Sequence, residues 1–251
     1  MKLSIITVAL NNAVSIEDTI CSILSQSYPD IEYIIIDGGS SDGTQAIIER
    51  YSHKITKVVS EPDQGMYDAM NKGISIARGD IVGILNADDI YNNSGILQQV
   101  ADSFVRTGAD ACYGDLVYVD QNAPSGHVVR LWRAGEYSRY KLYLGWMPPH
   151  PTFFVKRSCY ISYGGYRVDM GTSADYELML RYLLCHNVVP TYIPQQIVKM
   201  RIGGISNRSL LYRLKAHQAD WRSWRVNHLC PFPWTLPLKP LTKVHQWFMR
   251  G

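Results

Sequence analysis

The stretch from Ile31 to Thr44, IEYIIIDGGSSDGT, contains the pattern that decides the fold. Its first half is almost continuously apolar and rich in isoleucine, which indicates a buried strand that ends at Asp37. The glycines and serines after Asp37 indicate a turn, and residues 44–51 are predicted to form a helix. A fully apolar strand that leads into a helix is typical of a parallel sheet covered by helices on both faces.

The same alternation extends to both sides of this stretch. Ser15 is predicted to cap a helix, with Asp18 three residues further on, as in a capping box. The sequence therefore predicts an α/β fold with a mostly parallel central sheet flanked by helices. The other strands predicted here cover residues 3–10, 58–59 and 79–85, and a third helix covers residues 66–77.

The second half of the chain is less regular. Helices are predicted for residues 173–186 and 206–228, and four prolines in CPFPWTLPLKP, residues 230–240, end the second one. Strands are predicted at residues 109–113, 116–119, 128–132 and 196–202. We expect one domain over residues 1–205, followed by a helical extension over residues 206–251.

The composition is that of a globular protein, with 46% hydrophobic and 19% charged residues among 251. Five cysteines without a CxxC pair argue against structural zinc and against a disulfide framework, and they favour a reducing cytosol. The N-terminal segment MKLSIITVAL resembles a first strand rather than a signal peptide. Because the sequence has no apolar run of about 18 residues, we expect no membrane-spanning helix.

Polar side chains follow each strand of the predicted sheet. They are Asn11 and Asn12, Asp37, the segment EPDQG, and then Asn86, Asp88 and Asp89. In an open parallel sheet these positions meet at one edge, where ligands bind. Asp37 taken alone is equally typical of a turn. The GGSSDGT segment is not GxGxxG, so the fingerprint of a dinucleotide site is absent.

Asp88 and Asp89 are adjacent carboxylates after a buried strand. Two close carboxylates raise each other's pKa unless a cation compensates their charge. Oxygen ligands favour Mg²⁺ or Mn²⁺ over zinc, so the sequence predicts a divalent metal bound here. The alternative is a helix cap or a solvated turn.

The segment TSADYELMLR, residues 172–181, places Asp175 and Glu177 near the start of a helix. Negative charge is favourable there, so both can be explained without a function. A carboxylate on a rigid helix can also act as a general base. Residues two apart point about 200° away from each other, so we expect one of the two to face a site.

Taken together, several segments resemble glycosyltransferase family 2, whose fold is called GT-A. The resemblance covers about residues 1–205 and depends on the order of the whole set. Its segments are SIITVALNN, SILSQSYPDIEYIIIDGGSSDGT, EPDQGMYDAMNKGISIARGD, GILNADD, HPTFFVKRSCYISYGGYR and SADYELMLR.

The resemblance implies a role for individual residues. Asp88 would bind the metal with support from Asp89, and Asp175 would be the catalytic base. Asn86-Ala87-Asp88 occupies the family's DxD position, so an amide stands in place of the first acid. The acidic neighbour that often precedes the base is replaced by Ala174. The other residues expected to line the nucleotide-sugar are Thr7, Ala9, Asp37, Asp68, Asn71 and Arg201.

The implied reaction transfers a sugar from a nucleotide-diphosphate sugar, typically a UDP-sugar, to an acceptor hydroxyl, with inversion and with Mn²⁺ or Mg²⁺ as cofactor. The sequence lacks the Gln-x-x-Arg-Trp motif of processive members, which favours single additions. Arg201 could pair with phosphate or be a plain surface arginine. A sugar-nucleotide pyrophosphorylase and an inactive sugar-nucleotide-binding module remain as alternatives.

The C-terminal extension is basic and aromatic. From Arg208 onward eight lysines and arginines accompany one acid, Asp220. This pattern favours docking on an anionic membrane surface, and hence a lipid-linked saccharide acceptor on the inner face of the cytoplasmic membrane. Nucleic acid is a weaker rival, and simple packing of the aromatics onto the body is the third interpretation. The aromatic residues are Trp221, Trp224, Phe232, Trp234, Trp247 and Phe248.

Overall fold

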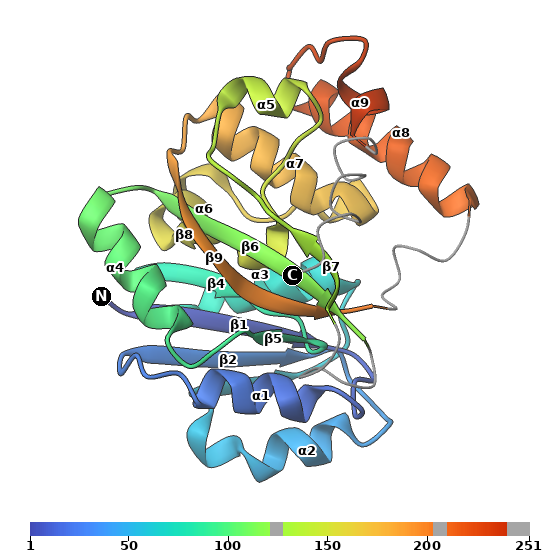
Figure 1. Cartoon of the computed structure of the whole chain (residues 1–251). Helices are drawn as coiled ribbons and strands as arrows, with labels where there is room; N and C mark the ends of the chain where they lie inside the picture. Colours follow the sequence, from blue (N-terminus) through green and yellow to red (C-terminus); the bar gives the residue numbers. More distant parts are fainter. Residues whose placement is uncertain (121–127, 203–209, 240–251) are drawn as a thin grey trace.

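The computed structural model describes residues 1–120, 128–202 and 210–239, and its strands join into one curled, nine-stranded sheet (Figure 1). The order is β3-β2-β1-β4-β8-β6-β9-β5, and β7 pairs with β6. The strands are β1 (Leu3–Ala9), β2 (Ile31–Asp37), β3 (Lys57–Ser60), β4 (Ile81–Ile84), β5 (Asp89–Tyr91), β6 (Ala111–Val119), β7 (Val128–Trp132), β8 (Phe154–Lys156) and β9 (Pro190–Arg201).

The first four strands of this order are parallel, as the sequence predicts. All residues of β1 are buried, because helices cover both faces of this half of the sheet. In the register Ala9 pairs with Asp37, and Ile6 pairs with Ile84. The polar residues that follow these strands therefore leave the sheet at the same edge.

The second half of the sheet is mixed. β8 runs antiparallel between β4 and β6, β9 runs parallel to β6, and β5 pairs antiparallel with β9. The strands expected at residues 109–113 and 116–119 are one strand, β6, whose register against β9 shifts around Asp115. The separation inferred from the sequence was wrong because an irregularity of this kind interrupts the apolar pattern without ending the strand.

Helices lie on both sides of the sheet (Figure 1). Those in the first part are α1 (Ile16–Leu24), α2 (Thr44–Arg50), α3 (Met66–Ile76) and α4 (Ile96–Thr107). The others are α5 (Arg139–Tyr143), α6 (Arg157–Tyr163), α7 (Ala174–Leu180), α8 (Leu210–Val226) and α9 (Thr235–Leu238). Single turns are η1 (Ser52–Lys54), η2 (His150–Thr152) and η3 (Val168–Ser173), and the π-turn η4 (Arg181–Cys185) continues α7.

Ser15 precedes α1 as predicted, but its side chain does not cap the helix. The hydroxyl instead donates to the carbonyl of Ala87 at 2.9 Å. Asp18 points away from the helix start as well and forms an ion pair with Arg201. The expected capping box was wrong because tertiary contacts offer both side chains partners outside the helix.

The C-terminal extension packs onto the rest of the chain through α8 and α9 (Figure 1). Trp224 is fully buried, and its indole N–H donates to the hydroxyl of Tyr176 at 2.9 Å. Asp220 accepts from Ser173 at 2.9 Å and pairs with Lys239 at 2.7 Å. For Trp224, packing onto the body of the protein therefore accounts for the aromatic side chain. The boundary at residue 205 lies outside the described residues, and the division into two domains stays a proposal.

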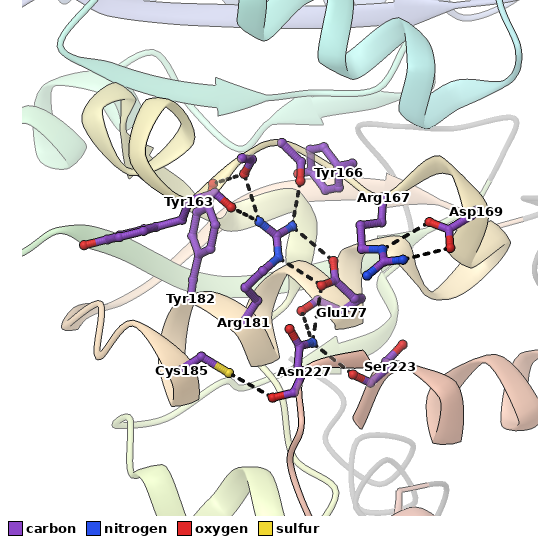
Figure 2. A network of polar contacts seen from close by, with 12 residues as sticks. Tyr163, Tyr166, Arg167, Asp169, Glu177, Arg181, Tyr182, Cys185, Ser223 and Asn227 are labelled. Atoms are coloured by element: carbon purple, nitrogen blue, oxygen red, sulfur yellow. Dashed lines mark hydrogen bonds and ion pairs between the residues drawn. The ribbon is translucent and has the colours of Figure 1, made fainter. Parts of the chain in front are cut away.

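A buried ion pair fixes α7 against its surroundings (Figure 2). The carboxylate of Glu177 is fully buried, and Arg181 binds it through two contacts of 2.9 and 3.1 Å. Arg181 also donates to the carbonyls of Gly164 and Gly165, and Asn227 of the loop after α8 donates to Glu177 at 3.3 Å. The network therefore joins α7 to the turn after α6 and to the end of α8.

We predict that Arg181→Met lowers the free energy of unfolding by about 3–5 kcal/mol, because it leaves the buried Glu177 carboxylate without its counter-ion. The matched control is Arg167→Met. Arg167 pairs with Asp169 at 3.1 Å in the same region, but both side chains are more than 40% exposed. The control should cost about 1 kcal/mol or less. Urea denaturation measures both, and equal losses would contradict the prediction.

Candidate active site

Asp37 ends β2 and is fully buried. Its carboxylate accepts hydrogen bonds from the hydroxyl of Ser60 at 2.6 Å, from the amide of Gln45 at 3.0 Å, and from both the hydroxyl and the backbone N–H of Ser40. Burial by itself raises the pKa of Asp37, but these hydrogen bonds outweigh it and hold the pKa below its usual value. Asp37 therefore stays ionised and anchors the loop that follows β2. Its contact with a nucleotide base stays a prediction.

Thr7 and Ala9 lie in β1 beside Asp37. The side chain of Thr7 is fully buried and accepts a hydrogen bond from Tyr33 at 3.3 Å. The carbonyl of Ala9 accepts from the backbone N–H of Gly38 at 2.9 Å. The structure therefore places Thr7 in the interior and Ala9 at the edge where β1 ends.

Asp68 and Asn71 lie on α3. Asp68 accepts from the backbone N–H of Gln64 at 3.1 Å and lies 3.6 Å from Lys72. Both ends of the Asn71 amide bind the backbone of Tyr166, each at 2.8 Å. Asn71 thus joins α3 to the segment before η3, and the side chain of Asp68 is 27% exposed.

The loop Asn86–Asp89 follows β4, at the same edge of the sheet as Asp37. Two hydroxyls hold it, one from Ser15, which precedes α1, and one from Thr19 within α1. Ser15 donates to the carbonyl of Ala87, and Thr19 donates to the carbonyl of Asp89 at 2.8 Å. The amide of Asn86 reaches a carboxylate oxygen of Asp89 at 3.4 Å. Asp88 is half-buried, and Asp89 is fully buried.

The two carboxylates of this loop lie in an environment that opposes their ionisation. Burial raises the pKa of Asp89 well above its usual range, and the charge of Asp88 raises it further. Burial also raises the pKa of Asp88. Arg201 acts in the opposite direction on both. The side-chain oxygens Oδ1 of Asn86 and Oδ1 of Asp89 are buried and have no protein partner.

These residues fit a divalent cation. Within the residues that the structure describes, no three His, Cys, Asp or Glu side chains gather in a metal-binding group. The donors available are two carboxylates and one unpartnered amide oxygen, which are hard oxygen ligands. Mg²⁺ and Mn²⁺ accept such partial sets and complete them with phosphate oxygens and water. A solvated turn does not explain Asp89, because it is fully buried.

Arg201 ends β9 and is 7% exposed, so the plain surface arginine considered from the sequence was wrong. Its guanidinium forms an ion pair with Asp18 on α1, while its Nε is buried without a protein partner. The charge of Arg201 lowers the pKa of both Asp88 and Asp89. The guanidinium of Arg201 therefore supplies positive charge to the Asn86–Asp89 loop.

Asp175 lies in the first turn of α7, and its side chain is 15% exposed. One carboxylate oxygen accepts from the backbone N–H of Tyr176 at 2.8 Å, and the other lies 3.0 Å from Nδ1 of His150. Glu177 turns instead toward Arg181 and is fully buried, whereas Asp175 is partly exposed, and that Asp175 faces a site stays a prediction. Sequence reasoning assigned no role to His150. Its place between two prolines was the one available signal.

The model of the family described as Glycosyl transferase family 2 matches residues 4–163. The chain belongs to this family. It is 32% identical over 193 residues to an uncharacterised glycosyltransferase of Mycobacterium tuberculosis strain H37Rv, covering 74% of this chain and 70% of the relative.

Another relative and a solved structure extend the comparison. A Mycobacterium bovis BCG protein named PGL/p-HBAD biosynthesis glycosyltransferase is 28% identical over 210 residues, with 81% and 78% of the two chains covered. The crystal structure of Staphylococcus aureus TarS 1-349 in complex with UDP-GlcNAc superposes with a TM-score of 0.69 at 17% identity. The match covers 90% of this chain and 65% of that one, and it supports the GT-A fold. The family and the fold class inferred from the sequence are thus confirmed.

We predict that the Asp88 carboxylate is required for metal binding, whereas Asn86 tolerates an acid. MnCl₂ with UDP should raise the melting temperature of the wild type and of Asn86→Asp, because a ligand that binds the folded state stabilises it by mass action. At a concentration of about 100 Kd that stabilisation is about 2.7 kcal/mol. Asp88→Asn should lose the metal-dependent part. Differential scanning fluorimetry measures the melting temperatures, with EDTA as the blank. A Mn²⁺-dependent shift in Asp88→Asn equal to that of the wild type would contradict the assignment of Asp88 as a metal ligand.

Proposed function

We propose that this chain transfers a sugar from a nucleotide-diphosphate sugar to a hydroxyl of a saccharide acceptor in one inverting step. One observation carries the proposal. The fully buried Asp89 and the half-buried Asp88 lie at the carboxyl edge of the parallel strands, with unpartnered oxygens on Asp89 and Asn86, in a chain of glycosyltransferase family 2. The nucleotide proposed is UDP, which is supported by the fold neighbour with bound UDP-GlcNAc.

The residues of the site divide the work of this step. Asp175 takes the proton of the acceptor hydroxyl, because a neutral hydroxyl is a poor nucleophile near pH 7. Arg201 pairs with a phosphate of the donor. Asp37 holds the loop after β2 beside the nucleotide base of the donor. When bound by Asp88, Asp89 and the Asn86 amide oxygen, Mn²⁺ or Mg²⁺ would neutralise charge on the departing diphosphate. Thr7, Ala9, Ala87, Asp68 and Asn71 complete the proposed donor site.

One set of contacts supports placing Asp68 and Asp175 in the same proposed site. Burial raises the pKa of the Tyr166 phenol, and the negative charge of Asp175 adds to this direction. The backbone of Tyr166 is bound by Asn71 on α3, and the rings of Tyr166 and Tyr67 lie 5.4 Å apart. These contacts join the segment before η3, which leads into α7, to the helix that carries Asp68.

Two alternatives predict different products. A pyrophosphorylase would release pyrophosphate from a nucleoside triphosphate and a sugar 1-phosphate. An inactive binding module would bind nucleotide-sugar without turnover. Family membership favours the transferase, and product analysis with and without EDTA separates the three.

The decisive variant is Asp175→Asn. We expect it to keep donor binding and to lose transfer by about 10²–10⁴-fold, since an amide cannot accept the proton. The measurements are release of nucleoside diphosphate with Mn²⁺ present, and the donor-induced thermal shift. A turnover within about threefold of wild type would overturn the role of Asp175 as general base.

We further propose that the acceptor is lipid-linked and that the chain acts in cell-surface polysaccharide assembly, peripheral to the inner face of the cytoplasmic membrane. The name of the mycobacterial PGL/p-HBAD relative supports an acceptor in glycolipid or surface-glycan synthesis. Among the residues that the structure describes, no helix is long and apolar enough to cross a membrane.

An aromatic patch formed by α5 and the C-terminal extension provides the membrane contact that we propose. It consists of Tyr140 on α5 with Phe232 and Trp234, which are 59%, 36% and 49% exposed. Phe232 stacks on Trp234 at 5.1 Å and meets Tyr140 at 6.4 Å. Exposed aromatic rings beside a basic segment suit an anionic lipid surface. Trp247 and Phe248 lie outside the described residues.

Substitution tests this contact better than deletion, because Thr235 and Leu236 after Cys230 are fully buried. The double variant Tyr140→Ser, Trp234→Ser should bind vesicles containing phosphatidylglycerol about tenfold more weakly than wild type, since it removes the interfacial rings. The control is Val105→Ser, which removes an exposed apolar side chain of α4. Co-sedimentation measures the binding. Equal binding of the double variant, or wild type that ignores these vesicles, would refute the membrane contact.

A further inference from the structure

His150 and Asp175 come from separate parts of the chain and meet through their side chains. Nδ1 of His150 lies 3.0 Å from Oδ2 of Asp175. A ring nitrogen and a carboxylate oxygen at this distance need a hydrogen atom between them, so Nδ1 carries the hydrogen and donates it. The backbone N–H of Tyr176 donates to the other oxygen at 2.8 Å. Both oxygens of Asp175 are therefore held, each by a different segment.

The segment that carries His150 is rigid. Prolines flank it at positions 149 and 151, and Pro148 precedes them, so the backbone has few alternatives. Thr152 is fully buried, and its hydroxyl lies 3.0 Å from the carbonyl of Gly114 in β6 and 2.8 Å from that of Pro149. The backbone N–H of Phe153 closes the turn on the carbonyl of His150 at 3.1 Å. These contacts attach the segment that carries the His150 imidazole to β6 of the central sheet.

The helix that carries Asp175 is equally constrained. Glu177 and Arg181 fix one side of α7 to the turn after α6 (Figure 2). Tyr176 is buried against α8, where Trp224 donates to its hydroxyl. Because other contacts fix both segments, neither residue can shift to accommodate the other. The hydrogen bond from His150 therefore constrains the orientation of the Asp175 carboxylate plane.

The exposure of the two side chains distinguishes this contact from a core ion pair. Asp175 is 15% exposed and His150 is 35% exposed, whereas Glu177 in the same helix is fully buried. A carboxylate has about four lone-pair directions. The two hydrogen bonds of Asp175 use two of them, and partial exposure leaves the carboxylate within reach of an incoming hydroxyl.

We propose that His150 is a positioning residue for Asp175, and this inference rests on the proposed role of Asp175 as general base. In the step, the O–H bond of the acceptor breaks and its proton passes to Asp175. The acceptor oxygen bonds to the anomeric carbon, while the bond from that carbon to the diphosphate oxygen breaks and its electron pair leaves with the diphosphate. The hydrogen bond from His150 holds the carboxylate in the orientation that receives the proton.

The test compares three substitutions of His150 with Asp175→Asn. Asn places an amide N–H close to the position of Nδ1, Gln places it further out, and Phe fills the space without a donor. We expect His150→Phe and His150→Gln to lower kcat about tenfold or more, with the KM for the donor within about twofold of wild type, because misplacing a reacting group lowers the rate of the chemical step. His150→Asn should stay within about threefold of wild type.

The assay measures nucleoside diphosphate released with MnCl₂ from UDP-glucose, UDP-galactose, UDP-GlcNAc, UDP-glucuronate and GDP-mannose, using the donor that the wild type turns over fastest. Melting curves confirm that each variant is folded. Full activity in His150→Phe with an inactive Asp175→Asn would overturn the positioning role alone. Equal loss in Asn, Gln and Phe variants, or a raised donor KM with unchanged kcat, would also overturn it. An active Asp175→Asn, or no turnover of any donor by wild type, would overturn the proposed function and this inference with it.

Discussion

The repulsion between two adjacent carboxylates, Asp88 and Asp89, is the constraint on which the candidate site depends. Both follow a buried strand, and burial makes their ionised forms costly. The surrounding structure limits that cost in three ways. Hydroxyls at the start of α1 and just before it fix the loop, the Asn86 amide donates to Asp89, and Arg201 contributes positive charge. We propose that the unpartnered oxygens that remain bind a cation.

The rest of the fold places other groups around this loop. The parallel register brings Asp37 to the same edge, where four hydrogen bonds keep it ionised despite full burial. The second half of the chain supplies Asp175 on α7, and the Glu177–Arg181 pair fixes that helix (Figure 2). The C-terminal extension supports the same helix from the other side through Trp224. The proposed general base therefore lies on a helix in the second half of the chain, whereas Asp37, Asp88 and Asp89 lie at or after the ends of strands in the first half.

Sequence reasoning succeeded where a pattern has a local physical cause. The almost continuous apolar run of Ile31–Ile36, interrupted by Glu32, favours burial on both faces, so the parallel strands and the position of Asp37 could be predicted. It failed where partners come from far along the chain. The hydroxyl of Ser15 reaches Ala87 instead of its own helix, and β5 is a short strand that exists because β9 lies beside it. Arg201 was not recognisable as buried for the same reason.

The sequence by itself determined the alternation of strands and helices, the family, and the placement of acids at the ends of strands. These properties follow from hydrophobic periodicity and from the order of segments along the chain. The tertiary structure alone decided which side chains meet. It paired His150 with Asp175, Arg201 with Asp18, and Glu177 with Arg181 rather than with solvent. The spacing of Glu177 and Arg181, four residues apart, made their contact possible, but only burial and long-range packing determined that it forms. The reason is that the free energy of a polar contact depends on the surroundings that the whole fold provides.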